Sequence, residues 1–384
     1  MLRARVLIVY PYMARYREGI FMQLANSDVD GVEYRFCSDS ETNEKSIELI
    51  DLETASQWMR WRRVKNVWFG RHILWQRGVL SAVSDNSITA VIFMGNMYYL
   101  STWVAGIFAR VSGKRVLFWT HGFRRQERGF KAWVRLLFYR IAHGLIVYGD
   151  KARRILASSG YPAKRVYVAH NSLDYEKQLA TRSKLTCSIL RETRARYFDA
   201  PERPLLVYVG RVNASKRLDM LVDAVSLLNE RRLDVNVLVI GAGPALNALR
   251  ELTKKRALEK QVKLLGACYD EETLGPILAA AHLCVVPGAL GLTGIHALTY
   301  GTPVLTHDDM DEHGPEFEAI IDGKTGSFFR KGNAQSLTDE ISRWVDLSTN
   351  RELIRRECYR VIEAGYTPVF QRRVFDAAAM DRPI

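Results

Sequence analysis

Short apolar runs, rich in β-branched residues, alternate with helical patterns along the whole of this chain. Each run has the length of one strand and is apolar on both faces, which is typical of parallel sheets covered by helices on both sides. The alternation predicts an α/β fold of doubly wound sheets, in which ligands bind beyond the carboxyl ends of the strands. The predicted strands are Val6–Tyr10, Ala90–Met94, Val116–Trp119, Gly144–Tyr148, Val166–Ala169, Leu205–Gly210, Asn236–Ile240, Gln261–Leu265, Leu283–Pro287 and Thr302–Thr306.

The strand pattern is interrupted near the middle of the chain, and each half of the 384 residues is large enough for one domain with a full core. A charged helical stretch runs to Phe198, and Pro201 and Pro204 precede the next strand. A last helix is expected after Pro368. We therefore expect Rossmann-like domains over residues 1–175 and 204–365, a linker over 176–203 and a C-terminal helix over 366–384.

The composition narrows the possible partners and surroundings. The formal net charge of +13 favours an anionic partner, such as nucleic acid, an acidic membrane surface or a phosphorylated substrate. The five cysteines are scattered and never spaced as C-x-x-C. This spacing argues against a disulfide framework or a structural zinc site and favours a reducing compartment.

One nearly apolar stretch, residues 91–111, has a length that also fits a membrane span. A turn signal at residues 95–96 interrupts it. We therefore predict a strand, a turn and a buried helix from about Tyr98 to Val111. No secretory signal is expected, because the short apolar run near the N-terminus is interpreted as the first buried strand.

The segment after the first strand of the C-terminal half carries cations next to a helix start. Gly210 is followed by Arg211, a short polar loop, Lys216 and a helix that begins near Leu218. A helix N-terminus at the carboxyl end of a strand favours anions, Arg offers a fork that matches phosphate geometry, and Lys adds a compact charge. The segment predicts phosphate binding, and the alternative is a solvated basic loop.

Two glycine-rich segments follow later strands of the same half. Gly241 and Gly243 allow a tight turn, although a plain strand-to-helix turn has the same spacing and the segment lacks the third glycine of a dinucleotide-binding motif. Gly288, Gly291 and Gly294 lie in a loop before a predicted helix. Such a loop exposes backbone N–H groups, which suits a second contact to a phosphate.

Taken in order, these motifs resemble retaining glycosyltransferases of the GT-B fold, in the large family 4 of that class. The set consists of Y-V-G-R with the later K-R, V-I-G-A-G-P, the glycine loop with A-L-T-Y-G-T-P-V, and E-F-E-A-I-I-D-G-K-T-G over residues 316–326. Each motif is weak alone, but the ordered set is specific. The N-terminal half resembles the family in pattern, with W-T-H-G at 119–122 and V-A-H-N-S-L-D at 168–174.

The resemblance implies two Rossmann-like domains that face a central cleft, with the acceptor bound by the N-terminal domain and the nucleotide sugar by the C-terminal one. It implies that the last helix crosses back to the N-terminal domain. It also implies that Arg211 and Lys216 act in catalysis by holding the donor diphosphate and stabilising its charge. The remaining donor contacts that it implies come from Gly210, Gly241, Gly243, Gly288, Gly291, Leu292 and Thr293.

GT-B enzymes generally need no metal, since protein cations neutralise the leaving diphosphate. We therefore interpret Asp308-Asp309-Met310-Asp311 as a solvated acidic loop. No cofactor is expected besides the sugar nucleotide, which is expected to be a UDP or GDP sugar.

The chain departs from the family at two glutamates separated by seven residues, of which the first lies near the transferred sugar and the second binds the ribose. Alignment on Gly301 puts Gly288 and His296 at these positions. His296 can still hydrogen-bond a ribose hydroxyl, and the alternative is a buried helix histidine. Glycine cannot replace a carboxylate, so the sugar is held differently or another acid serves, for which Glu316 and Glu318 are candidates.

Candidate site residues of the N-terminal half lie at strand ends. His121 follows the strand at 116–119, and in the family a histidine here often lies near the donor sugar, which makes it a candidate catalytic residue. The alternative is a loop histidine that caps the next segment. Tyr12, Tyr16 and Arg17 lie on the first turn and early helix, where we expect them to shape the acceptor site; helix packing is the alternative.

Two stretches of the N-terminal half, residues 58–71 and 124–140, mix Arg or Lys with Trp or Phe. In the second stretch, apolar side chains share one helical face and basic residues lie alongside. This predicts an interfacial helix on an anionic membrane, where each basic residue contributes about 1 kcal/mol. The alternative is a helix whose apolar face packs on the core. The apolar residues are Phe130, Trp133, Val134, Leu137 and Phe138.

We therefore expect transfer of a sugar, with retention of configuration, from a nucleotide donor to a lipid-linked or membrane-proximal glycan. The expected setting is bacterial polysaccharide or lipopolysaccharide synthesis, in the cytoplasm and peripheral on the inner face of the membrane. A nucleotide-sugar epimerase on a similar fold and a non-catalytic scaffold without the glutamates are alternatives. Binding of nucleic acid is supported only by charge, without a recognised motif, and is not expected.

Overall fold

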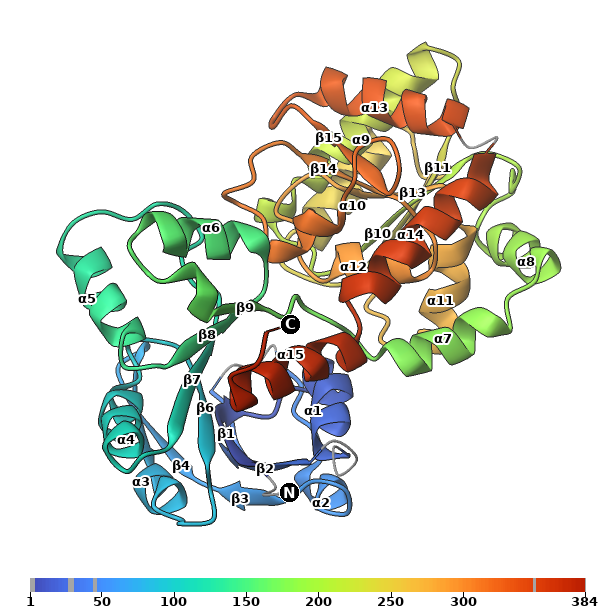
Figure 1. Cartoon of the computed structure of the whole chain (residues 1–384). Coiled ribbons are helices and arrows are strands. Elements are labelled where there is room, and N and C mark those ends of the chain that lie inside the picture. Colours follow the sequence, from blue (N-terminus) through green and yellow to red (C-terminus); the bar gives the residue numbers. More distant parts are fainter. Residues whose placement is uncertain (1–3, 27–30, 44–46, 348–349, 384) are drawn as a thin grey trace. The chain divides into compact units, whose positions relative to one another are not determined.

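The computed structural model describes residues 4–26, 31–43, 47–347 and 350–383. The chain divides into two compact units, one made of Met1–Asp174 with Gly365–Ile384 and the other of Tyr175–Ala364. Each unit contains a parallel β-sheet with helices on both faces (Figure 1). The prediction of two Rossmann-like α/β units is confirmed.

The main sheet of the first unit has the order β3-β2-β1-β6-β7-β8-β9, and each neighbouring pair is parallel. One face packs on α1, α2 and α15, and the other packs on α3, α4, α5 and α6. Parallel pairing brings the carboxyl ends of β1, β7 and β8 to the same edge. The bounds are β1 (Ala4–Tyr12), β2 (Val32–Asp39), β3 (Trp61–Arg63), β6 (Ala90–Met94), β7 (Arg115–Thr120), β8 (Gly144–Val147), β9 (Val166–Val168), α1 (Glu18–Ala25), α2 (Leu52–Ala55), α3 (Val79–Val83), α4 (Leu100–Val111), α5 (Phe130–Tyr139), α6 (Asp150–Ser158) and α15 (Pro368–Met380).

The last helix, α15, lies within the first unit. Thr367 begins it by accepting a hydrogen bond from the Phe370 N–H at 3.2 Å, and proline at the first helical position needs no hydrogen-bond partner there. Its buried Phe375 ring packs edge-on against Trp119 of β7, with the ring centres 4.9 Å apart. The helix therefore completes the hydrophobic core beneath this sheet.

The sheet of the second unit has the order β12-β11-β10-β13-β14-β15, again with parallel neighbours. The order reverses at β10, which is the place where ligands bind in open parallel sheets. The bounds are β10 (Leu205–Val209), β11 (Asn236–Ile240), β12 (Val262–Gly266), β13 (Leu283–Val286), β14 (Val304–His307), β15 (Gly326–Phe329), α9 (Leu218–Glu230), α10 (Leu246–Lys255), α11 (Glu271–Ala280), α12 (Thr293–Thr299), α13 (Ala334–Leu347) and α14 (Arg351–Gly365).

Residues 176–203, which we expected to be a linker with a charged helical stretch, contain two helices. These are α7 (Tyr175–Ser183) and α8 (Cys187–Tyr197), and both pack against α11 of the second unit. The Arg182 guanidinium donates to the Thr299 carbonyl at 2.9 Å and lies 3.9 Å from the centre of the Tyr359 ring. The segment therefore belongs to the second unit by its packing.

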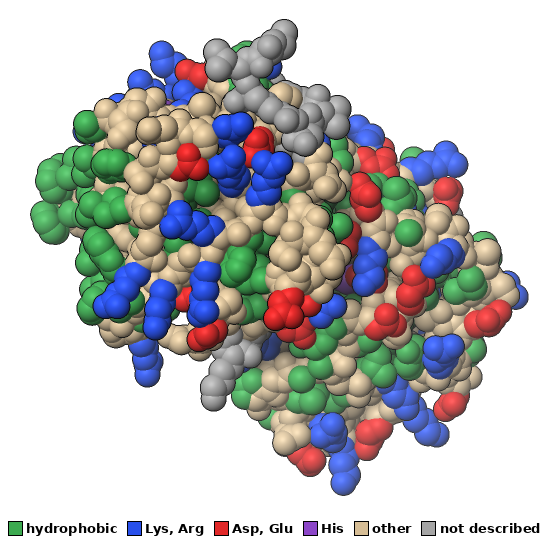
Figure 2. All heavy atoms as spheres, turned by 90° about the horizontal axis from the view of Figure 1, so that it is seen from below, with side chains coloured by type: hydrophobic (Ala, Val, Ile, Leu, Met, Phe, Trp, Pro, Cys, Tyr) green, Lys and Arg blue, Asp and Glu red, His purple; other side chains and the backbone are tan. Residues whose placement is uncertain are grey.

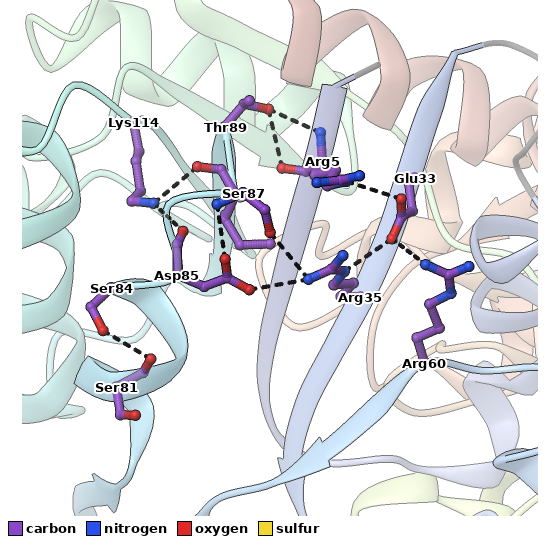
Figure 3. Close-up of polar contacts among 11 residues, drawn as sticks. Arg5, Glu33, Arg35, Arg60, Ser81, Ser84, Asp85, Ser87, Thr89 and Lys114 are labelled. Carbon is purple, nitrogen blue, oxygen red and sulfur yellow. Dashed lines mark hydrogen bonds and ion pairs between the residues drawn. The ribbon is translucent and has the colours of Figure 1, made fainter. Parts of the chain in front are cut away.

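The apolar-run criterion missed β2, because charged residues interrupt this strand. Glu33 is buried, and its carboxylate accepts hydrogen bonds from Arg5 at 3.1 Å, Arg35 at 3.0 Å and Arg60 at 2.6 Å (Figure 3). These ion pairs satisfy the charge and lower the pKa of Glu33 against the opposing effect of burial. A parallel strand with such partners need not be apolar. The hairpin of β4 (Lys65–Phe69) and β5 (Ile73–Arg77) was also not predicted.

The expectation that the helix ending at Val111 is buried is wrong. One face of α4 packs on the sheet through Ala105 and Ala109, which are fully buried. The other face is exposed and carries Leu100, Val104, Ile107, Phe108 and Val111. Among the described residues, no helix combines the length and the apolar character that crossing a membrane requires.

Candidate functional site

Glycines hold the ends of β10 and β11 close together at the topological switch of the second unit. Gly241 and Gly243 have φ values of +152° and +158°. A Cβ on Gly241 would lie 1.8 Å from the Gly210 carbonyl oxygen, and one on Gly243 would lie 2.1 Å from that of Val212. The Val212 N–H in turn donates to the Ala242 carbonyl at 2.9 Å. Only glycine permits this approach, which fixes the path of the segment that carries Arg211.

The cations predicted to hold phosphate lie on this segment. Arg211 is exposed and forms no ion pair with any described residue, while its carbonyl accepts a hydrogen bond from the Tyr208 hydroxyl at 2.9 Å. Lys216 ends a short 3-10 helix and donates to the Ala289 carbonyl of the glycine loop. Burial lowers the pKa of Lys216, and the charge of Glu316 acts in the opposite direction. The structure thus offers one open guanidinium and one half-buried ammonium at the carboxyl end of β10.

The glycine loop packs directly on the Lys216 segment. A Cβ on Gly288 would lie 2.0 Å from the Ser215 carbonyl oxygen and 2.7 Å from Lys216 Cα. The chain therefore has no room for any side chain at position 288. Gly291, by contrast, faces open space, and Thr293 donates from its hydroxyl to the Val209 carbonyl at 2.7 Å.

The H-G-P-E segment supports the glycine loop from the other side. The Leu290 N–H donates to His313 Nδ1 at 3.0 Å, and the Gly314 N–H donates to the Leu290 carbonyl at 2.8 Å. His313 Nε2 donates to the His307 carbonyl at 2.7 Å, so the imidazole is neutral with its proton on Nε2. Burial is the main cause that lowers the pKa of His313 to about 4.

This support places Glu316 beside the glycine loop. Its side chain is buried, and a Cβ on Gly314 would lie 2.2 Å from Glu316 Oε2. Its charge also acts on Lys216, where it partly offsets the lowering of the pKa by burial. Of the two acids considered from the sequence, Glu316 is therefore the one whose charge acts on Lys216.

His296, in α12, is partnered by an acid that sequence reasoning missed. Its Nε2 lies 2.9 Å from Oε1 of Glu271, and the Tyr300 hydroxyl donates to the same oxygen at 2.6 Å. Burial would raise the pKa of Glu271, but the hydrogen bonds from His296 and Tyr300 lower it. The only sequence signal for Glu271 is its place after Asp270, which caps α11 by accepting from the Thr273 N–H at 3.0 Å.

In the first unit, two of the three predicted acceptor residues, Arg17 and Tyr16, lie together in a cluster of aromatic rings around the buried Arg17 guanidinium. Arg17 is 7% exposed and donates from Nη2 to the Tyr148 hydroxyl at 2.8 Å. Its guanidinium carbon lies 4.6 Å from the centre of the Trp119 ring and 5.2 to 5.7 Å from the rings of Tyr10, Tyr16 and Tyr148. We call these five residues the Arg17 cage. Tyr12, the last residue of β1, is half-buried and pairs with Asp39 of β2.

His121 lies next to this cage, at the end of β7. Its ring centre is 4.6 Å from that of Tyr148, and the residue is exposed. Desolvation by the surrounding protein, together with the charges of Arg124 and Arg17, lowers the pKa of His121. The imidazole is therefore neutral near pH 7, and it shares the Tyr148 ring with Arg17.

The acidic loop at residues 308–311 shows no metal-binding arrangement. Asp309 pairs with Lys331 at 2.8 Å, and Lys331 also reaches Glu312 at 2.6 Å. In the described part of the chain, no group of three or more His, Cys, Asp or Glu side chains is arranged to hold a metal ion.

Comparison with known proteins places these features in context. Residues 191–361 match the family described as Glycosyl transferases group 1. An alpha-D-kanosaminyltransferase of Streptomyces kanamyceticus is 26% identical over 250 residues, which cover 64% of this chain but only 62% of that relative, less than two thirds of its length.

Solved structures share the fold at low sequence identity. The Anabaena protein HepE in complex with UDP superposes with a TM-score of 0.72 and 16% identity, covering 98% of this chain and 100% of that one. WaaB, a lipopolysaccharide outer core galactosyltransferase, superposes with a TM-score of 0.68 and 12% identity, covering 98% and 99%. The fold of this chain is therefore that of the GT-B glycosyltransferases.

Proposed function

Because residues 191–361 form a domain of the glycosyl transferases group 1 family, we propose that this protein transfers a sugar from a nucleoside-diphosphate donor to a glycan or lipid-linked acceptor, with retention of configuration. The observation that carries the proposal is the cation pair Arg211 and Lys216 at the carboxyl end of β10, packed against the glycine loop. The HepE structure with bound UDP, a protein of the same fold, supports UDP as the first donor base to test. GDP is the second.

The donor diphosphate binds between Arg211 and the glycine loop. Arg211 has no competing acid among the described residues, so its fork is available to phosphate oxygens. Lys216 is held in place by its hydrogen bond to the Ala289 carbonyl. Its half-buried ammonium group stays charged because the negative charges of Glu316 and of the diphosphate stabilise it. Both cations stabilise the negative charge that grows on the leaving diphosphate.

The ribose and sugar contacts use a different set of acids from the usual glutamate pair. His296 has Nε2 directed to Glu271, which leaves Nδ1 for a ribose hydroxyl. Glu316 supplies a carboxylate beside the phosphate cations, whereas position 288 has no room for one. We assign Glu316 to the transferred sugar on this basis.

The transfer step breaks the bond between the sugar anomeric carbon and the leaving phosphate oxygen. The acceptor hydroxyl oxygen forms the new bond on the same face, and its proton passes to the phosphate oxygen that leaves. This route needs no protein base. The low pKa of His121 makes its imidazole a weak base, and the neutral ring can donate a hydrogen bond.

The acceptor is proposed to lie at a membrane that the first unit contacts through α4 and α5. Phe130 is 78% exposed and Trp133 is 59% exposed, and their rings stack 5.8 Å apart. Phe138, which we placed on this apolar face from the sequence, is instead buried and stacks on Phe118 of β7. Figure 2 shows hydrophobic side chains gathered at the edge of this unit, with Lys and Arg side chains nearby.

The proposal is tested by following sugar-nucleotide turnover by the full chain. UDP and GDP sugars are incubated with and without a membrane lipid extract, and released nucleoside diphosphate is measured. We expect release from one donor that increases when acceptor is added and that falls by orders of magnitude in Arg211→Ala. Donor conversion to an isomer without acceptor would support an epimerase instead, and no turnover or binding of any donor would support a non-catalytic scaffold.

A further inference from the structure

The Arg17 cage contains a buried positive charge without a counter-charge. Among the described residues, no carboxylate forms an ion pair with Arg17, and its polar side-chain partner is the neutral Tyr148 hydroxyl. A buried guanidinium is normally paired with a carboxylate or a phosphate, because isolated burial of a charge is strongly unfavourable. The aromatic faces of the cage offset part of this penalty, since a ring face attracts a cation.

The cage also leaves hydrogen-bond donors unused. Arg17 Nε and Trp119 Nε1 are both buried and have no hydrogen-bond partner in the described structure. Buried donors are almost always satisfied, and each unsatisfied one reduces stability. Two such donors beside one uncompensated cation point to an acceptor that carries negative charge.

The position of the cage fits a ligand from outside. It lies at the carboxyl ends of β1, β7 and β8, the edge at which parallel sheets bind ligands. Tyr16 of the cage is 43% exposed, and the neighbouring His121 is exposed, so a ligand can reach the edge of the cage formed by these two residues. The neutral His121 supplies a further hydrogen-bonding group without adding charge.

We propose that the Arg17 cage binds a carboxylate or phosphate group of the acceptor, so that the protein prefers an anionic acceptor to a neutral one. That the bound anion belongs to an acceptor rests on the proposed transferase function, whereas binding of an anion at the cage does not depend on it. Phosphate and carboxylate make the same hydrogen bonds to a guanidinium, so separate probes have to distinguish them.

The test measures binding of small anions to the full chain by calorimetry and thermal shift. D-glucuronate, α-D-glucose 1-phosphate and neutral D-glucose are compared at constant ionic strength, with UDP or GDP, whichever binds, present in excess to fill the nucleotide site. We expect glucuronate or glucose 1-phosphate to bind and to raise the melting temperature, and glucose to do neither. The stronger of the two anions identifies the group that the cage recognises.

Variants decide whether the cage is the site. Arg17→Met should weaken binding of the anion by about tenfold or more. Arg15→Met is the matched control, because Arg15 lies two residues away, is exposed and pairs with Glu48 at 3.3 Å; it should leave binding unchanged. If Arg17→Met does not fold, Tyr148→Phe, which removes the hydroxyl that orients Arg17, should still weaken anion binding severalfold.

Three outcomes would overturn the inference. The first is that neither glucuronate nor glucose 1-phosphate binds, and the second is equal binding of the anion by wild type and a folded Arg17→Met or Tyr148→Phe variant. The third is binding of glucose as tight as that of glucuronate and glucose 1-phosphate. Nucleotide binding measured in the same samples separates this inference from the proposed function. If UDP or GDP binds but no anion does, the inference alone fails; if no nucleotide binds but Arg17 is needed for anion binding, the transferase proposal fails.

Discussion

Nε2 of His296 and Oε1 of Glu271 lie 2.9 Å apart, and Tyr300 donates to the same carboxylate oxygen. The pair joins α12, the helix that directly follows the glycine loop, to the start of α11. A histidine thus stands, with an acid behind it, at the position where the resemblance to family 4 implied a glutamate. The acid fixes which ring nitrogen is free and which way the imidazole points.

Glu271→Gln should raise the KM for the sugar nucleotide by about tenfold with a smaller effect on kcat, because the change loosens the orientation of His296 and not the leaving-group charges. Glu272→Gln is the control, since the adjacent Glu272 is exposed and pairs with Lys184 at 3.0 Å. Steady-state kinetics of both variants check this. An unchanged KM in Glu271→Gln would show that the pair serves packing only.

Gly288→Ala should reduce the free energy of unfolding by about 1–3 kcal/mol, because the added Cβ would meet the Ser215 carbonyl oxygen at 2.0 Å and force the loops apart. Gly291→Ala lies in the same loop but faces open space, so its stability should match the wild type. Urea denaturation of the two variants measures the difference. Equal stability of the pair would contradict the close packing of the glycine loop on the Lys216 segment.

Stability should fall as the pH is lowered from about 6.5 to 5, because buried histidines of the second unit must stay neutral. Burial and nearby arginines lower the pKa of His282 to about 3, and its Nδ1 accepts from the Leu205 N–H at 2.9 Å. A histidine with a lowered folded pKa binds its proton more readily when unfolded. Its contribution is therefore complete above the unfolded pKa and is lost as the pH falls towards the folded value.

Each such histidine adds a slope of up to about 1.4 kcal/mol per pH unit in this range. His282→Asn keeps an acceptor near the position of Nδ1 but removes the titration, so the slope should decrease; His313, with a pKa of about 4, maintains part of it. His72→Asn, at an exposed position, is the control and should leave the slope as it is. A slope that does not change in His282→Asn would contradict this account.

Replacing Phe130 and Trp133 together by serine should weaken binding to phosphatidylglycerol vesicles by about tenfold or more, because two large exposed rings no longer enter the interface. Leu353→Ser removes a 62% exposed apolar side chain from the second unit and serves as control. Vesicle co-sedimentation at two salt concentrations measures the effect. Equal binding of the double variant and the control would remove α5 from the proposed membrane contact.

The sequence pattern predicted those elements whose structure depends on their own residues and not on contacts with distant segments. Apolar runs indicated the central strands because both faces of a parallel sheet are buried. They did not indicate β2, because this strand contains Glu33, whose buried charge is paired with arginines 2, 27 and 28 residues away in the sequence. The exposure of α4 and the burial of Phe138 could also not be predicted, since periodicity shows that a helix has an apolar face and not what covers it.

The candidate sites likewise contain some features that the sequence predicts and others that only the folded chain shows. Arg211, Lys216 and the glycines follow strands directly, so their grouping at one sheet edge could be expected from the parallel fold. The absence of room at Gly288 and the acid behind His296 depend on contacts between distant segments, Ser215 and Glu271, and only the folded chain shows them. Likewise, Arg17 was expected to face a ligand, but its lack of a counter-charge is a property of the packed cage.

The central claim is that a nucleoside diphosphate binds at Arg211 and Lys216, and calorimetric titration with UDP, GDP, ADP and dTDP tests it most directly. One of these should bind the wild type, and Arg211→Ala and Lys216→Ala should each weaken it by about tenfold or more. Arg256→Ala, which removes an exposed arginine paired with Asp223, should bind like the wild type. Binding that both site variants retain in full, or no binding of any of the four nucleotides to the wild type, would contradict the account.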